Sequence, residues 1–184
     1  MVANAIPTRY RSVQFRSRLE AKWAACFDLL GWPWEYEPID LNGYIPDFVL
    51  GFHRPLLVEV KPALTLEELV PHRKRIEASG WQHEALIVGA RWWDGASAQC
   101  SYSDEAPVVG DVGEGNGVGW GWDRCELFHC LECGKPSLVE SYGYWQCKRS
   151  GCYSGNNHIG VLSSAQWYWH EAGNRVQWRA PCAG

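Results

Sequence analysis

Two carboxylates and a lysine are spaced so that they could meet at one point of a β-hairpin. Asp47 precedes one short apolar run, Glu59 and Lys61 end the next, and a turn over residues 51–55 separates them. Side chains of a strand alternate between faces, so Glu59 and Lys61 are expected on one face and Val58 on the other. If the two runs pair, Asp47 lies near Glu59. Such a set can hold a divalent metal ion and position a water molecule beside it.

The same pattern would also suit a hairpin with one wet face, because charged and apolar residues alternate in half-exposed strands. Two features favour the metal site. The run from Leu56 to Val60 is otherwise continuously apolar, as in a strand buried on both sides. A third acid, Glu20, lies upstream in a helix predicted over residues 15–30, which ends before Gly31.

Glu20 is expected at the inward edge of this predicted helix. Its spacing from Trp23 and Phe27 puts the three side chains on one helix face. A carboxylate there needs a cation or strong hydrogen-bond donors as partners. Arg16, one turn earlier, offers a simple helix ion pair. A metal ion shared with the two hairpin carboxylates is the more specific prediction.

The order of these motifs resembles the PD-(D/E)xK nuclease superfamily, whose fold is restriction-endonuclease-like. The resemblance rests on a helix glutamate, then Pro46-Asp47 on one strand, then Glu59-Val60-Lys61 on the next, and it covers residues 15 to about 90. It implies an α/β fold with a mixed central sheet flanked by helices. The further elements expected are strands over 34–41 and 84–89 and a helix over 64–79 that Pro71 interrupts.

The resemblance implies metal-dependent hydrolysis of phosphodiester bonds. Asp47 and Glu59 would be ligands of Mg²⁺ (or Mn²⁺), with the Val60 carbonyl as a third ligand, because oxygen ligands suit hard cations. Lys61 would orient the attacking water and stabilise the charged transition state. Glu20 would reach the same metal ion or a second one. An alternative role for Lys61 is a structural ion pair with Glu59 or Asp47.

Four cysteines form a second set of candidate ligands. Cys130-x2-Cys133 is followed by Cys147-x4-Cys152, and Gly134 after the first pair is typical of a zinc knuckle. Two such turns joined by a hairpin would give a structural Zn²⁺ site that resembles a zinc ribbon.

The longer second spacing leaves other ligands open, namely His129, His158 and Cys125. Two disulfides are the alternative to zinc. The chain opens with no signal peptide, so a reducing cytoplasm, that of a bacterial or phage-infected cell, is expected, and there thiols stay reduced.

Composition suggests three parts. Residues 95–123 are rich in glycine, contain no Lys or Arg and hold five of the 21 acidic residues, which predicts an acidic loop or linker. It would join a nuclease core over 1–94 to a zinc-ribbon-like module with a Trp-rich end over 124–184. No apolar run is long enough for a transmembrane helix.

The net charge of −4 does not exclude nucleic acid as a partner, because local clusters of basic residues matter more than the total. Solvated surface is the alternative role for each basic residue. The candidates for phosphate contacts are Arg16, Arg18, Arg73, Lys74, Lys148 and Arg149.

These features together predict a metal-dependent nuclease that acts on DNA, with RNA not excluded, as an endonuclease rather than an exonuclease. A homodimer or a larger nucleoprotein assembly is compatible with this role. One alternative is a non-catalytic nucleic-acid-binding or assembly subunit that uses the nuclease-like fold as a scaffold. Another is a zinc-stabilised interaction protein without a nucleic-acid role.

Overall fold

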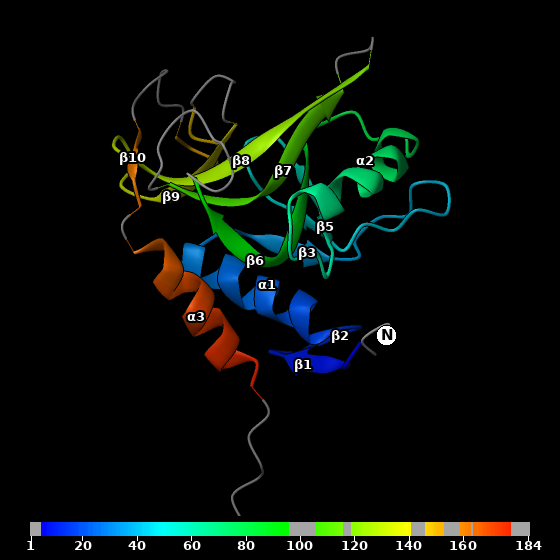
Figure 1. Ribbon diagram of the computed structural model, residues 1–184, viewed down its shortest axis with the longest axis horizontal. Coiled ribbons are helices and arrows are strands. Elements are labelled where there is room, and N and C mark those ends of the chain that lie inside the picture. Colours follow the sequence, from blue (N-terminus) through cyan, green and yellow to red (C-terminus); the bar gives the residue numbers. More distant parts are fainter. Residues whose placement is uncertain are drawn as a thin grey trace, which may run out of the picture.

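A mixed eight-stranded sheet runs through the protein, with helices on both of its faces (Figure 1). The computed structural model describes residues 5–95, 106–115, 119–140, 146–152, 159–162 and 164–177. Strands β3 to β8 are neighbours in chain order, and β9 and β10 both pair with β8. The sheet contains β3 (Trp34–Tyr36), β4 (Phe48–Leu50), β5 (Leu56–Val60), β6 (Ala85–Asp94), β7 (Pro107–Gly115), β8 (Trp120–Cys130), β9 (Pro136–Glu140) and β10 (Ile159–Val161).

The prediction of an α/β protein with a mixed sheet is confirmed. β4 is antiparallel to both of its neighbours, β3 and β5, whereas β5 and β6 are parallel. The parallel pair needs a crossover, which α2 (Val70–Glu77) and a preceding 3-10 turn (Glu67–Leu69) supply. Pro71 does not interrupt a helix as predicted. It lies in the first turn of α2, where its missing N–H costs no helical hydrogen bond.

The first helix, α1 (Arg18–Leu30), is the predicted helix with a later start. It ends at Gly31, whose φ of 67° is in the left-handed region that glycine tolerates best. The Trp23 indole N–H donates to the Gly89 carbonyl of β6 at 2.9 Å, which ties the helix to the sheet. α3 (Ala165–Arg175) lies beside α1, where the rings of Trp169 and Trp23 are 4.8 Å apart (Figure 1).

β5 is buried on both faces, as its continuous apolar run predicted. Leu56, Val58 and Val60 belong to the core beneath α1. Leu57 points to the other face, into a smaller core that includes Ile76 of α2. Glu59 shares the face of Leu57, because side chains two residues apart in a strand point the same way.

The predicted loop over residues 95–123 is wrong for its described part, most of which forms β7 and the start of β8. Two of its glycines, on β7, are sites of close packing. A Cβ on Gly110 would lie 2.0 Å from the Ile87 carbonyl oxygen, and one on Gly113 would lie 2.5 Å from the Trp122 ring. Glycine is therefore required because another backbone or an indole ring occupies the space of a side chain. Residues 96–105 and 116–118 of this stretch lie outside the described residues.

An acid of the same stretch is a core residue. Asp111 on β7 is fully buried, with the Arg73 guanidinium at 2.6 Å and the Arg124 guanidinium at 2.5 Å. β8 crosses the predicted boundary at residue 124, with β7 on one side and β9 on the other. The sheet is thus continuous from the predicted nuclease core into the predicted zinc module.

A short hairpin that was not predicted precedes α1. β1 (Thr8–Tyr10) pairs antiparallel with β2 (Val13–Phe15), and Phe15 is buried against Tyr36 and Phe48. Within the described part of the chain, no helix combines the length and apolar character needed to cross a membrane.

Candidate active site and cysteine cluster

Asp47 and Glu59 meet across the β4–β5 hairpin, as their spacing predicted. Phe48 pairs with Val58, so the same register places Asp47 opposite Glu59. Both residues are almost fully buried, with 4% and 5% of their whole surface exposed. Asp47 Oδ2 accepts a hydrogen bond of 2.7 Å from the Val60 N–H, which fixes the aspartate against β5. Asp47 Oδ1 faces the Arg16 guanidinium at 2.5 Å.

Glu59 is held by one predicted and one unpredicted partner. Lys61 Nζ donates to Glu59 Oε1, and the Tyr44 hydroxyl donates to Glu59 Oε2 at 2.8 Å. The lysine is also held through its backbone, because Lys61 N–H donates to the Val88 carbonyl of β6 at 2.9 Å. Tyr44 lies on the connection between β3 and β4, and no local pattern in the sequence marks it.

Glu20 lies in the first turn of α1 and pairs with the N-cap residue Ser17. Its N–H donates to Ser17 Oγ at 3.1 Å, and the Ser17 hydroxyl donates back to Glu20 Oε1 at 2.8 Å. Glu20 Oε2 accepts from the Tyr36 hydroxyl at 2.6 Å and from the Arg16 N–H at 3.2 Å. The Ser-x-x-Glu spacing of a capping box carried this signal in the sequence. Glu20 therefore has a structural role, and its role as a metal ligand stays a prediction.

Burial and mutual repulsion disfavour ionisation of both Asp47 and Glu59 at the same time. Burial, together with the charge of Glu59, raises the pKa of Asp47 to about 7, although the Val60 N–H and Lys61 oppose the shift. Burial and the neighbouring Glu59 also raise the pKa of Tyr44 above its ordinary range, so this hydroxyl stays a donor. The site can accept additional positive charge.

The donor set fits a hard divalent cation. Asp47 and Glu59 offer carboxylate oxygens in a buried setting, which are the ligand types that Mg²⁺ and Mn²⁺ prefer. Within the described part of the chain, however, no third acidic, histidine or cysteine side chain joins these two carboxylates in a tight group. Among the described residues, the group of three or more potential ligand side chains within 4.8 Å of one another is the cysteine cluster. A cation at the hairpin would thus need backbone or water oxygens as well.

The four predicted cysteines form this cysteine cluster, and together they can bind a metal ion such as zinc. The Sγ atoms of Cys130 and Cys152 are 3.9 Å apart, as are those of Cys133 and Cys147. Four Zn–S bonds of about 2.3 Å in a tetrahedron require sulfur atoms about 3.8 Å apart. A disulfide needs about 2.05 Å, so these separations fit a metal site, and in the structure all four cysteines are free thiols rather than members of the two disulfides considered as the alternative.

The turn after Cys130 has the form that its glycine predicted. Gly134 has a φ of 68°, and its N–H donates to the Cys130 carbonyl at 2.9 Å. Cys125, an alternative ligand, is instead buried in the core beneath α1. His129 is not part of the cluster, while His158 lies outside the described residues.

Three of the six predicted nucleic-acid contacts are used inside the protein. Arg73 binds the buried Asp111, as described above. Lys148 donates to Glu84, with only 16% of its side chain exposed. Arg149 donates to the carbonyls of Leu30 at 3.2 Å and Gly31 at 2.7 Å, at the end of α1. Each is therefore a structural contact. Arg18 and Lys74 are exposed, and Arg16 belongs to the hairpin site.

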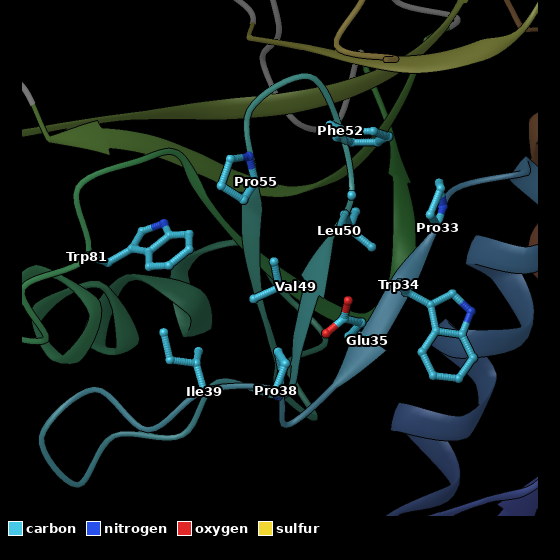
Figure 2. A pocket seen from close by; sticks show the side chains of 11 residues that line it. Pro33, Trp34, Glu35, Pro38, Ile39, Val49, Leu50, Phe52, Pro55 and Trp81 are labelled. Carbon is cyan, nitrogen blue, oxygen red and sulfur yellow. The ribbon is translucent and has the colours of Figure 1, made fainter. Parts of the chain in front are cut away.

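An apolar hollow of about 460 Å³ opens beside the hairpin on β3 and β4 (Figure 2). Val49, two residues after Asp47, contributes to its floor, and Trp81 and Ile39 flank it. Glu35 is the one charged side chain of its described lining. Neither Asp47 nor Glu59 lines this hollow, so it does not enclose the carboxylates.

Comparisons with protein-family models, with curated proteins and with solved structures found no significant match.

Proposed function

We propose that this protein is a metal-dependent nuclease that hydrolyses DNA phosphodiester bonds. One observation carries the proposal. Two buried carboxylates, Asp47 and Glu59, meet across a hairpin, and Lys61 contacts one of them. Burying two neighbouring carboxylates costs free energy unless a cation compensates their charge. A fold retains such a pair most readily where a metal ion is part of its function.

The order of the elements supports a restriction-endonuclease-like core for the same region. α1 is followed by β3, β4 and β5, then by α2 and by β6 parallel to β5. Asp47 directly precedes β4, Glu59 lies near the end of β5, and Lys61 directly follows β5. This is the arrangement implied by the PD-(D/E)xK resemblance. We therefore interpret residues 15 to about 90 as the catalytic core.

Within this proposal, each residue of the site has a separate task. Asp47 and Glu59 would hold the metal ion, and the Val60 carbonyl is a further oxygen within the same segment. Mg²⁺ or Mn²⁺ bound there would supply charge neutralisation at the phosphate and a lowered pKa of a water molecule. Lys61 supplies a positive charge beside the reacting phosphate and hydrogen bonds that orient the water. Tyr44 keeps the Glu59 carboxylate in one orientation through its hydrogen bond.

The cysteine cluster lies next to the proposed catalytic core and contacts the turn between β4 and β5 through the segment of its second cysteine pair. We assign it a structural Zn²⁺, because four thiolates leave no open coordination position for a substrate. The segment that carries its second pair contacts the hairpin turn, since the His53 N–H donates to the Lys148 carbonyl at 2.9 Å. Zinc would thus fix the turn that joins β4 and β5.

One observation favours the alternative of a non-catalytic DNA-binding subunit. Arg16 and Lys61 already contact Asp47 and Glu59 in this structure, and such ion pairs could neutralise the carboxylates without any metal ion. In that case the fold would be a scaffold, and metal binding would be weak. Cleavage assays separate the two functions directly.

The test is incubation of the purified protein with circular duplex, linear duplex, single-stranded and branched DNA and with RNA, in Mg²⁺, Mn²⁺ or chelator. Cleavage of circular DNA that requires the metal would support an endonuclease. Asp47→Asn and Lys61→Met should abolish cleavage, whereas Glu35→Gln, an exposed acid on β3, should leave it unchanged. If Asp47→Asn cuts like the wild type, or if no substrate is cut but DNA is bound, the catalytic proposal is wrong.

A further inference from the structure

The Arg16 guanidinium contacts three carboxylates that come from different parts of the chain. Arg16 Nε lies 3.0 Å from Glu37 Oε1 and 3.9 Å from Glu20 Oε2, and its NH2 group lies 2.5 Å from Asp47 Oδ1. Glu20 belongs to α1, Glu37 to the segment after β3, and Asp47 directly precedes β4. A single cation is thus surrounded by acids, as a metal ion would be.

Arg16 approaches this site from the solvent side. Its side chain is 57% exposed, whereas the side chains of Asp47 and Glu20 are 6% and 11% exposed. Its backbone N–H contacts Glu20 and the Tyr36 hydroxyl, and those contacts do not involve the guanidinium. The side chain could therefore leave the carboxylates while the start of α1 stays in place.

The two oxygens of Asp47 are not equally open to an incoming cation. Oδ2 already accepts the Val60 N–H inside the hairpin, whereas Oδ1 faces the exposed side chain of Arg16, so a metal ion that approaches from solvent meets Oδ1 first. A guanidinium and a divalent ion repel each other at that distance. Binding of the metal ion and the Arg16–Asp47 contact are thus in competition.

We propose that Arg16 is a built-in counter-ion of the hairpin site that a divalent metal ion displaces. Without metal it neutralises Asp47. After displacement its guanidinium is available to a phosphate oxygen of bound DNA, to which it can donate two parallel hydrogen bonds. Metal binding and DNA binding are then coupled, and each strengthens the other by the same factor. This inference rests on the proposed nuclease function and adds a role for Arg16 within it.

The first test measures metal affinity in the absence of DNA, by calorimetric titration of Mg²⁺ and of Mn²⁺ into the zinc-loaded protein. Arg16→Gln removes the competing charge and should bind the ion about tenfold more tightly than the wild type. Arg16→Lys keeps the charge and should stay near the wild-type affinity. Because Arg16 is mostly exposed, both variants should fold, which circular dichroism would check.

The second test measures the coupling, by DNA binding with and without Ca²⁺ as the probe ion. The ion should increase the DNA affinity of the wild type, and Arg16→Gln should lose most of this increase. If the wild type cuts DNA but Arg16→Gln binds Mg²⁺ no more tightly, the counter-ion role is refuted and the nuclease proposal stands. If the wild type neither binds Mg²⁺ nor cuts, the nuclease proposal itself fails.

Discussion

Replacing Asp47 by Asn should remove the loss of stability that the wild type shows as the pH rises toward 8, although it should abolish the proposed activity. Asp47 is buried beside Glu59, and its pKa is raised from an ordinary value near 3.8 to about 7. Between these values the native carboxyl binds a proton that the unfolded chain has lost. Stability therefore falls as the pH rises through this window, and it stops falling above about pH 7.

The size of the effect follows from the pKa. Each pH unit well inside the window lowers the free energy of unfolding by about 1.4 kcal/mol, and the fall levels off near the native pKa. Raising the pH from 5 to 7 therefore lowers the free energy of unfolding of the wild type by about 2.3 kcal/mol. Asn cannot ionise, yet its carbonyl oxygen can still accept the Val60 N–H. The difference in free energy of unfolding between Asp47→Asn and the wild type should therefore shift in favour of the variant by about 2 to 3 kcal/mol between pH 5 and pH 8.

Urea unfolding of the wild type and Asp47→Asn at several values between pH 5 and 8, without added Mg²⁺, measures this difference. Glu35→Gln is the matched control, because this acid is exposed and should keep the wild-type pH dependence. Mg²⁺ at 100 times its Kd should restore about 2.7 kcal/mol to the wild type and nothing to Asp47→Asn. The reasoning is refuted if both proteins show the same pH dependence without Mg²⁺.

Three further predictions concern the contacts around this site. Purified protein should carry one zinc ion per chain and Cys133→Ser should lose it, so zinc-free, fully folded wild-type protein in elemental analysis would contradict the assignment. Arg149→Ala should lower the free energy of unfolding by about 2 to 3 kcal/mol without loss of zinc, because the carbonyls at the end of α1 lose their donor. A denaturant unfolding curve identical to that of the wild type would disprove this. Asp111→Ala should lower the free energy of unfolding by about 3 to 5 kcal/mol, because the charges of Arg73 and Arg124 are left beside each other without the carboxylate. A free energy of unfolding within about 1 kcal/mol of the wild type, measured by thermal unfolding, would contradict this.

The elements that could be predicted are those whose signal is local. The apolar stripe of α1 repeats over a few helical turns, and Gly31 marks its end. The run from Leu56 to Val60 indicates a strand buried on both faces. The spacing of Asp47 and Glu59 about a short turn predicted their meeting, because a hairpin has one dominant register. The cysteine pairs were equally readable, since each pair lies within one turn of chain.

The predicted loop over 95–123 shows where a local pattern misled. Glycine and acidic residues are frequent in loops, but Gly110 is needed because the Ile87 carbonyl lies against it, and Asp111 is needed because two arginines surround it. Ile87 lies on the neighbouring strand, 23 positions earlier in the chain. Composition alone cannot distinguish a glycine that makes the backbone flexible from one that lets a neighbouring backbone or ring approach closely.

By itself, the sequence determined which side chains could do chemistry and which short segments carry them. Alternation along strands and spacing along α1 are properties of the backbone, so they can be read from neighbouring residues. Only the tertiary structure decided the partners of those side chains. It brought Arg16 to Asp47, Tyr44 to Glu59 and Lys148 to Glu84, and a side chain's charge state and exposure depend on such distant neighbours because burial and Coulomb interactions act through space rather than along the chain.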